Sequence, residues 1–452
     1  MNWKNYYEQR VLPAQEAVKV IRSGDRVVQG HACGEPTCLV EAMVDRAGEL
    51  EGVEIVHMVS MGKARYCRPE YSKSFTHNSL FVGSTSRQAI HEGRGDYTCC
   101  FFSEIPLLFR DNLLPVDVAL ITVSPPDKSG FVCLGISVDY TKQASLSAKT
   151  VIAAVNPNMP RIAGDSYLHV TDIDYFVPTE EALIELNPPT LGQLEKAIGS
   201  NVSTLIRDGD CLQLGIGALP DAVLSFLGDK TDLGIHSEMI SDGVMNLAEA
   251  GVITCKRKTF RPRKAVITFA MGTKKFYQWL DNNALMESHP VDFTNDPYII
   301  AKNDNMVSIN SAISVDLQGQ VAADCLGPKQ FSGVGGQVDF VRGANQSKGG
   351  RSIIAMPSTA ANGKASRIVA ALDRGQAVTT SRNDVAYVVT EHGIASLKGK
   401  TVRQRAEALI AIADPRFRDE LREDFLSVYG LRGTVIQVPV QLTVAENIEH
   451  RC

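Results

Sequence analysis

Short apolar runs alternate along the chain with segments whose apolar residues recur every three or four positions. The runs at 116–123, 150–155 and 352–356 are typical of buried strands. Between 191 and 205 the apolar residues are spaced 3, 4, 4 and 3 apart, which predicts one amphipathic helix. Strands that alternate with helices in this way predict an α/β fold with a mainly parallel sheet.

The segment that follows this helix predicts a strand, a loop and a second helix. Asp208-Gly209-Asp210 is a turn signal, 211–214 is a short apolar strand, and 215–219 is a glycine-containing loop. Pro220 then suits the first turn of a helix. A further strand is predicted over 233–240.

Four pieces of sequence recur in the same order in the two halves of the chain. IRSGDRVVQG at 21–30 matches IRDGDCLQLG at 206–215, and HMVSMG at 57–62 matches EMISDG at 238–243. Two shorter pairs follow at nearly the same offset: Gly83-Ser84 with Gly272-Thr273, and Asp127-x-x-Gly130 with Asp316-x-x-Gly319. The chain is therefore predicted to be a tandem duplication of two similar α/β domains. The acidic, proline-rich segment 171–190 suggests a boundary between 1–186 and 187–452.

Composition narrows the class of protein. The 452 residues carry a net charge of −5, with 44% hydrophobic and 21% charged residues, as in ordinary globular proteins. This argues against disorder, and the absence of a basic excess argues against a nucleic-acid-binding surface. No secretory signal and no apolar run of membrane-spanning length are visible. We therefore expect a cytoplasmic protein whose ten cysteines are thiols.

Two glycine-rich loops are candidate ligand sites. Gly215-Ile216-Gly217 follows a predicted strand and precedes a helix, where backbone N–H groups can face an anion. A dinucleotide fingerprint would need a third glycine where Pro220 stands, and Asp232 is its only acidic candidate for a ribose. A plain tight turn explains the loop equally well. The loop 332–337 places three glycines in four residues and is either an anion-binding nest or a flexible surface loop.

Glu238 is the candidate nucleophile. It is predicted at the end of a strand, before the turn Ser241-Asp242-Gly243, and the repeat places His57 at the matching position of the first half. A structural role shared by both domains would tend to keep the residue type, whereas a chemical role in one domain would not. A carboxylate held near backbone donors can act as a covalent nucleophile. The alternative is a salt-bridged or capping glutamate.

The remaining motifs favour structural roles. The basic run 256–264 suits a solvated hairpin or linker better than a phosphate site. Ser124-Pro125-Pro126-Asp127 is typical of a rigid turn that leads into a strand. No histidine spacing indicates a metal site, and no serine-hydrolase elbow is present.

Taken together, these motifs resemble the acetyl-CoA hydrolase/transferase family. The matching pieces are QLGIGALPDA at 213–222, GIHSEMISDGV at 234–244, FSGVGGQVDF at 331–340 and VTEHGIA at 389–395, with SPPD at 124–127 and SRND at 381–384 in place. The resemblance covers nearly the whole chain. It implies two open, mainly parallel α/β domains with the active site in the cleft between them. Within the family, the chain most resembles the enzymes that transfer CoA between 4-hydroxybutyrate or butyrate and acetate.

The resemblance also implies roles for individual residues. Glu238 would be the catalytic glutamate of a ping-pong reaction that proceeds through a glutamyl-CoA thioester. Oxyanion donors and part of the CoA site would come from the two glycine-rich loops, with Asn310 as a lesser candidate; the residues are Gly215, Ile216, Gly217, Ala218, Leu219, Gly335 and Gly336. His31, in the first-half counterpart of the Gly215 loop, would line the acyl pocket, unless it is a satisfied core histidine.

The partners implied are acyl-CoA and a small carboxylate, with no metal, no permanently bound cofactor, no nucleic acid and no membrane. A homodimer or higher homo-oligomer is expected. Three other functions stay open on sequence grounds: an acyl-CoA hydrolase of the same family, a nucleotide-binding dehydrogenase built on Gly215-Ile216-Gly217, and a non-catalytic CoA-binding sensor.

Overall fold

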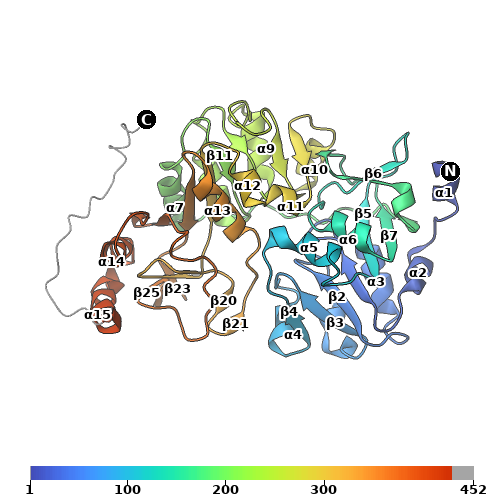
Figure 1. The fold of residues 1–452 in the computed structure, drawn as a ribbon, viewed down its shortest axis with the longest axis horizontal. Coiled ribbons are helices and arrows are strands. Elements are labelled where there is room, and N and C mark those ends of the chain that lie inside the picture. Colours follow the sequence, from blue (N-terminus) through green and yellow to red (C-terminus); the bar gives the residue numbers. More distant parts are fainter. Residues whose placement is uncertain (1, 430–452) are drawn as a thin grey trace.

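Two mainly parallel sheets, one in each half of the chain, form the framework of the protein (Figure 1). The structure is a computed structural model, and it describes residues 2–429. The first sheet is entirely parallel. Its strands, in spatial order, are β10 (Tyr175–Pro178), β7 (Thr150–Val155), β5 (Val118–Val123), β1 (Arg26–Gln29), β2 (Val53–His57), β3 (Phe75–Ser79) and β4 (Gly95–Tyr97).

The second sheet repeats this topology. Its spatial order is β12 (Gly234–Ile235), β11 (Cys211–Gln213), β17 (Met306–Asn310), β22 (Arg351–Ala355), β26 (Tyr387–Thr390) and β27 (Gly393–Ser396), with only β27 antiparallel. Read from β26 to β12, this is the order of β10 to β2 in the first sheet. A bridge between His236 and Val266 adds β14 (Ala265–Ile267) and β16 (Met286–Ser288) where the first sheet has β3 and β4. The predicted fold class, a duplicated open α/β domain, is confirmed.

The repeated turns Asp127–Gly130 and Asp316–Gly319 are built alike in atomic detail. In both, the aspartate Oδ1 accepts the backbone N–H groups of the second and fourth residues after it, at 2.8–3.0 Å. Gly130 and Gly319 have φ angles of 88° and 91°, a region that favours glycine. Spacing in the sequence therefore identified the same turn twice.

The register of the paired strands ends before Glu238. Arg26 of β1 pairs with Glu54, and its repeat partner Cys211 of β11 pairs with Gly234. Glu238 lies beyond the end of β12, where this register no longer applies. There the carbonyl of His57 accepts the N–H of Leu80, as the carbonyl of Glu238 accepts that of Thr268. The match of Glu238 with His57 stays a prediction, in which only the second domain has a carboxylate here.

The predicted local elements agree well with the structure, with two differences. The amphipathic helix is α7 (Gln193–Ser203), and the next helix, α8 (Ala218–Ser225), begins before Pro220 and has the proline inside its first turn. The strand predicted over 233–240 is interrupted. Glu238 lies between β12 and β13 (Met239–Ile240), and β13 pairs with β15 (Phe269–Ala270) instead of continuing the main sheet.

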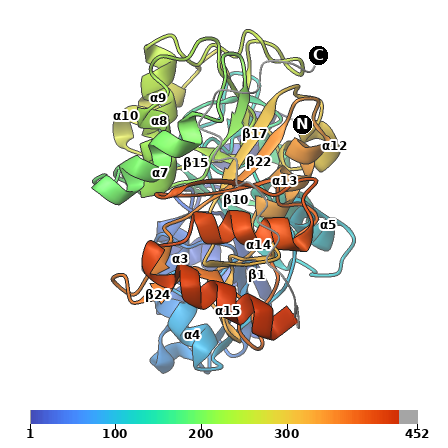
Figure 2. The same cartoon turned by 90° about the vertical axis from the view of Figure 1, so that its left-hand side faces the viewer.

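Other helices cover the sheets and close the ends of the molecule (Figure 1). They are α1 (Trp3–Glu8), α2 (Ala14–Ala17), α3 (Thr37–Asp45), α4 (Arg87–His91), α5 (Ile105–Arg110), α6 (Thr141–Ser147), α9 (Asp242–Glu249), α10 (Lys274–Leu280), α11 (Val291–Thr294), α12 (Pro297–Ile300) and α13 (Gln337–Gln346). In Figure 2, α14 (Val402–Ala411) and α15 (Arg418–Tyr429) lie side by side and cover one end of the second domain. A layer of short strands beside them includes β18 (Ser314–Asp316), β20 (Cys325–Leu326), β21 (Lys329–Gln330), β23 (Thr359–Ala360) and β25 (Ile368–Val369).

The two domains share one apolar core. The largest cluster of buried residues runs from Phe102 and Ile136 of the first domain to Met239 and Phe269 of the second. Backbone pairing joins them as well, because Ser137 bridges Phe269 across the junction. Residues 179–192, which contain the predicted boundary, have no regular secondary structure. The domains are therefore packed together as one body.

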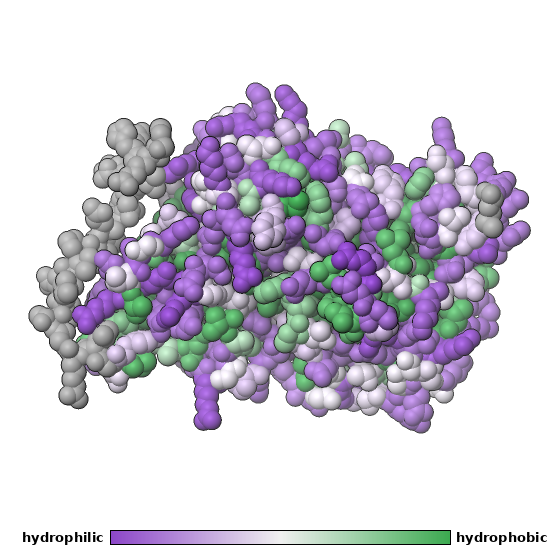
Figure 3. Space-filling model, in the orientation of Figure 1, coloured by the Kyte–Doolittle hydropathy of each residue, from purple (hydrophilic) through white to green (hydrophobic). Residues whose placement is uncertain are grey.

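Polar residues make up most of the face shown in Figure 3. On the face shown in Figure 3, apolar residues form small patches between polar side chains. Among residues 2–429, no helix combines the length and the apolar character that crossing a membrane requires. The nine cysteines of this part of the chain are free thiols; most are buried, while Cys99 is exposed.

Close packing of α7 against α8 sets the position of the Gly215 loop, which generates a stability prediction. A Cβ on Gly199 would lie 2.8 Å from the carbonyl oxygen of Ala222 and 3.0 Å from the nitrogen of Val223. We expect Gly199→Ala to lower the free energy of unfolding by about 1–3 kcal/mol, since backbone atoms must move apart. Urea unfolding measures this. Gly228→Ala is the control, because a Cβ there meets nothing within 4 Å; equal losses in the two variants would contradict the packing argument.

Candidate active site

Glu238 lies where the second sheet meets the first domain. Its backbone carbonyl accepts hydrogen bonds from Thr268 and Phe269 at 3.0 and 3.2 Å, which fixes the main chain in the gap between β12 and β13. The carbonyl of Thr268 accepts the N–H groups of Val138 and Asp139 from the first domain. The nucleophile candidate is thus anchored through a segment that both domains hold.

Two groups enclose the carboxyl group of Glu238. The Asn295 amide donates from Nδ2 to Oε2 at 2.9 Å. On the same oxygen, Gly336 approaches so closely that a Cβ built on it would lie 2.0 Å from Oε2 and 2.4 Å from Asn295 Nδ2. Gly336 has an ordinary φ of −92° as the N-cap of α13, so glycine is required here for space and not for backbone conformation. The loop 332–337, ambiguous in sequence, thus lies against Glu238.

The surroundings of Glu238 favour its neutral form. Burial raises the pKa of its carboxyl from 4.5 to about 7, and the negative charges of Asp339 and Asp139 act in the same direction. The Asn295 amide and the Gly336 backbone oppose this rise in pKa. A carboxyl that ionises near neutral pH is a stronger nucleophile than an ordinary glutamate and is still available as the anion. Titratable groups with such shifts concentrate at functional sites.

Five of the residues predicted to contact CoA line one cavity of about 370 Å³. Gly215, Ile216, Ala218, Leu219 and Asn310 all line it. Gly217 belongs to the same loop, has a φ of 105° and is the N-cap of α8. The other walls come mainly from apolar groups, together with Arg367 and Glu195. The structure therefore brings together residues that are almost a hundred positions apart in the chain.

Two amide side chains connect this cavity with the Glu238 site. Gln337, the residue after Gly336, donates from Nε2 to the carbonyl of Ser311 in the cavity wall at 2.6 Å. Gln213 and Asn310 exchange hydrogen bonds between their amides at 3.1 and 3.3 Å. Gly335 and Gly336 lie on the Glu238 side of this connection and are not among the cavity-lining residues.

His31 lies beside the site without lining the cavity. It is 2% exposed, its Nδ1 is 3.3 Å from Asp139 Oδ2, and its ring packs on Phe269 with 4.6 Å between centroids. Ser137 Oγ donates to the same Asp139 oxygen at 3.0 Å. His31 is thus a buried, hydrogen-bonded histidine. It contacts Phe269, whose backbone N–H donates to the Glu238 carbonyl.

Two further expectations have structural outcomes, and one residue of the site was not expected. In the basic run, Lys258 is buried and donates to the carbonyls of Ile235 and Lys264, so this residue supports the end of β12 and is not part of a solvated hairpin. Asp232 accepts the hydroxyl of Thr254 at 2.8 Å. Sequence reasoning missed Asn295, because this residue directly follows the short helix α11 and no motif surrounds it. Only its proximity to Glu238 in the folded structure identifies it.

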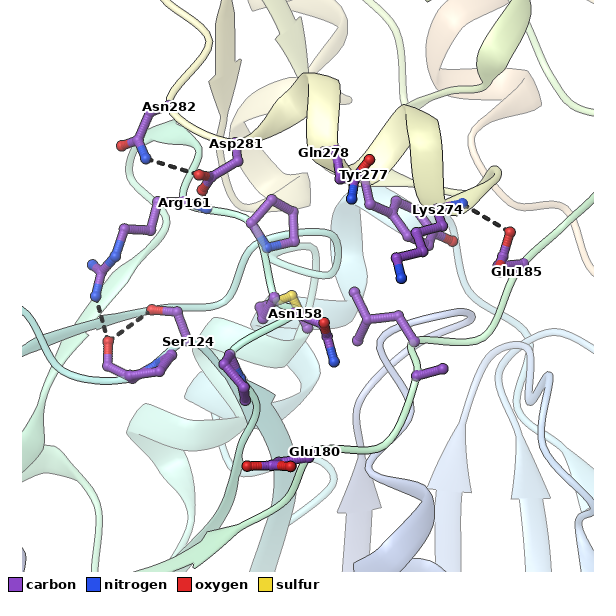
Figure 4. A pocket seen from close by; sticks show the side chains of 16 residues that line it. Ser124, Asn158, Arg161, Glu180, Glu185, Lys274, Tyr277, Gln278, Asp281 and Asn282 are labelled. Carbon is purple, nitrogen blue, oxygen red and sulfur yellow. Dashed lines mark hydrogen bonds between the residues drawn. The ribbon is translucent and has the colours of Figure 1, made fainter.

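A larger cavity, of about 710 Å³, lies elsewhere (Figure 4). It is formed where 157–161 of the first domain and the linker around Glu185 approach α10, and its side chains carry both charge signs, including Arg161, Lys274 and Asp281. The Lys274 backbone N–H donates to Glu185. None of the predicted site residues lines it, so the chemistry is assigned to the Glu238 site and not to this cavity.

The raised pKa of Glu238 predicts a pH-dependent stability gain on its removal. A carboxyl whose pKa is higher in the folded than in the unfolded protein costs stability as pH rises from 4.5 toward and past 7. We expect Glu238→Gln, which keeps an acceptor for Asn295, to raise the free energy of unfolding at pH 8 by about 1–3 kcal/mol. At pH 5 the gain should be much smaller. Chemical denaturation at both pH values checks this, and a gain independent of pH would contradict a buried ionised carboxylate.

Comparison with known proteins assigns the family. The acetyl-CoA hydrolase/transferase N-terminal domain model matches residues 1–187, and the C-terminal domain model of the same family matches residues 272–425. The 4-hydroxybutyrate coenzyme A transferase of Clostridium kluyveri is 59% identical over 425 residues, which are 94% of this chain and 99% of that protein. The butyryl-CoA:acetate CoA-transferase of Anaerostipes caccae is 40% identical, over 94% of this chain and 97% of its own length.

A solved structure agrees with these relatives. The crystal structure of 4-hydroxybutyrate CoA-transferase from Porphyromonas gingivalis superposes with a TM-score of 0.81 at 42% identity, covering 94% of this chain and all of that one. The duplicated fold, the glycine loops and the enclosed glutamate thus occur in a chain that belongs to the acetyl-CoA hydrolase/transferase family, among its CoA-transferases.

Proposed function

We propose that the protein transfers CoA between a short acyl-CoA thioester and a carboxylate by a ping-pong reaction, with Glu238 as the covalent nucleophile. The observation that carries the proposal is the Glu238 carboxyl itself. It is enclosed at the domain junction, faces two hydrogen-bond donors, and has a pKa raised to about 7 by burial. The substrate pair, 4-hydroxybutyrate or butyrate with acetate, is proposed on the names of the related enzymes.

The covalent steps follow from the chemistry of a carboxylate and a thioester. An oxygen of ionised Glu238 attacks the thioester carbonyl carbon, the carbon–sulfur bond breaks, and CoA leaves as the thiolate, with an acyl-glutamyl anhydride as product. The thiolate then attacks the glutamyl carbonyl and expels the acyl group as its carboxylate. The remaining glutamyl-CoA thioester reacts in reverse with the incoming carboxylate. One thioester replaces another, so no energy source is needed.

The groups around Glu238 suit the second step. When the thiolate adds to the glutamyl carbonyl, the negative charge gathers on an oxygen of Glu238. The Asn295 Nδ2 already donates to Oε2 at 2.9 Å, and the backbone of Gly336 acts on the same carboxyl. Preorganised donors of this kind are typically worth about 10²–10³ in rate each.

The 370 Å³ cavity is the proposed site for the pantetheine arm of CoA. Its walls are largely apolar, from Ile216, Leu219 and Ile309, with Asn310 available to an amide of the arm. Arg367 supplies a positive charge at the cavity, although two of its nitrogens already donate to the carbonyls of Thr359 and Ala312. The connection through Gln337 and Ser311 leads from this cavity to Glu238.

Mass spectrometry tests the intermediate directly. Butyryl-CoA alone, without an acceptor, should leave CoA attached to the peptide that contains Glu238, since the first half-reaction needs no second substrate. Glu238→Gln should form no adduct and lose at least about 10³-fold in transfer rate, because the amide is not a nucleophile. An unmodified wild-type peptide together with an active Gln variant would refute the mechanism. Decay of the adduct in buffer alone is then compared with its decay after acetate is added. This comparison distinguishes a hydrolase from a transferase.

The close approach of Gly336 predicts a second effect on activity. The methyl group of Gly336→Ala would collide with Glu238 Oε2 and Asn295 Nδ2, so the carboxyl must turn away. We expect adduct formation to fall by about 10²-fold, as for a reacting group displaced by about 1 Å. Thermal unfolding serves as the fold control. Gly228→Ala, where a Cβ meets nothing within 4 Å, provides the matched substitution in a turn of this domain; a Gly336→Ala enzyme with wild-type adduct formation would contradict the geometry.

A further inference from the structure

Two consecutive residues of the first domain, Phe102 and Ser103, hold the beginning of α13 in the second domain. The Phe102 N–H donates to the carbonyl of Gly335 at 3.2 Å. Ser103 donates twice to the carboxyl of Asp339, from its backbone N–H at 3.2 Å and from its hydroxyl at 2.9 Å. Gly336, which abuts the Glu238 carboxyl, lies between these two contacts in the chain. The first domain therefore fixes both ends of the segment that encloses the nucleophile.

Asp339 is a carboxyl group in a buried position, where its desolvation is unfavourable. It is 3% exposed, and burial raises the pKa of its carboxyl to about 7, while Ser103 opposes the rise. Burying a carboxylate costs free energy that an apolar residue on this face of α13 would avoid. Its neighbours Val338, Phe340 and Val341 are apolar and buried. Packing alone therefore does not account for an aspartate at this position.

Asn295 connects Asp339 with Glu238. Its Nδ2 donates to Glu238, and the same amide favours the ionised form of Asp339. Asn295 is fully buried, and its Oδ1 has no hydrogen-bond partner among the described residues. An unpaired amide oxygen is tolerated only where other contacts determine the orientation of the group. Here the two carboxyl groups do so, because they both attract the NH₂ end of the amide.

We propose that Asp339 is a positioning residue for the nucleophile: held by Ser103 of the first domain, it orients the Asn295 amide and the first turn of α13 toward Glu238. This inference rests on the proposed covalent role of Glu238. It adds that the contact between the domains holds both hydrogen-bond donors of Glu238, the Asn295 amide and the Gly336 backbone, in place. If the contact were lost, Asp339 would lose two of its donors and would no longer hold the first turn of α13 in place.

The charges around the pair determine the direction of the expected effects. Asp339 and Asp139 face Glu238, and Glu104 faces Asp339; all are carboxylates that raise the pKa of the group they face. The nearby Cys100 thiol stays neutral, because burial raises its pKa to about 12. Since Glu238 must be ionised to attack, removing the Asp339 charge lowers the pH at which the attack begins. Because the carboxyl groups interact, the measured midpoint belongs to the pair.

The test is the pH dependence of glutamyl-CoA formation, measured by rapid quenching and mass spectrometry with butyryl-CoA between about pH 5.5 and 8.5. We expect Asp339→Asn to move the acid midpoint down by about one pH unit and to lower the plateau rate about ten-fold. Ser103→Ala should lower the plateau by a similar factor and move the midpoint less, in the same direction. Asp281→Asn is the matched control, because Asp281 also accepts a backbone N–H from the other domain, that of Arg161 at 2.8 Å, outside the Glu238 site.

The outcomes separate the two proposals. Unchanged midpoints in folded Asp339→Asn and Ser103→Ala enzymes would overturn the positioning role while the Glu238 adduct still formed. A midpoint shift of the same size in Asp281→Asn would overturn it too, because the effect would then be a general consequence of weakening the domain contact. If the wild-type enzyme forms no adduct at any pH, the covalent role of Glu238 itself fails. If Asp339→Asn does not fold, Ser103→Ala alone decides the question by its midpoint.

Discussion

A carboxyl group at the junction of two domains has to satisfy two opposing requirements, and the rest of the site depends on how they are balanced. In the proposed reaction, burial strengthens Glu238 as a nucleophile and protects reactive intermediates from water, but it also favours the protonated form. The Asn295 amide and the Gly336 backbone offset this by favouring the anion. With one donor fewer the pKa of the carboxyl would lie still higher, and with full solvation it would be that of an ordinary glutamate.

Duplication of the domain explains how such a site can arise. Both halves contain the same strand order and the same aspartate turns, so each half folds by the same pattern of hydrophobic burial. The sequence repeat sets His57, which is buried and not a carboxylate, against Glu238 in the first half. The first domain contributes instead through its contacts: Ser137 against Phe269, and Ser103 against Asp339. One copy holds the reactive group, and the other encloses it.

The sequence predicted the fold better than the details of the site, for physical reasons that differ between residues. Repeats and hydrophobic periodicity indicate which residues are buried, and burial determines where the strands of the sheets lie. The duplicated α/β fold can therefore be predicted from the sequence. The match of Glu238 with His57 stays a prediction, because the strand is interrupted between β12 and β13 and its pairing does not reach Glu238. The Gly215 loop was recognised from its position between strand and helix. Asn295 could not be, because it follows a single helical turn and reaches Glu238 only through tertiary packing.

Assembly of the site from both domains also bears on the choice between transfer and hydrolysis. The anhydride and the glutamyl thioester both react with water, so a transferase has to keep the acceptor side of Glu238 closed until a carboxylate arrives. Close to the Glu238 backbone, Phe102 and Phe269 of the shared apolar core pack around the ring of His31. Of the two groups that act on the Glu238 carboxyl, Gly336 lies in the segment that the first domain clamps, Gly335 to Asp339, while Asn295 follows α11. In the proposed reaction, activation of the nucleophile therefore depends in part on the contact between the domains, so that a loosened junction would leave a less reactive glutamate.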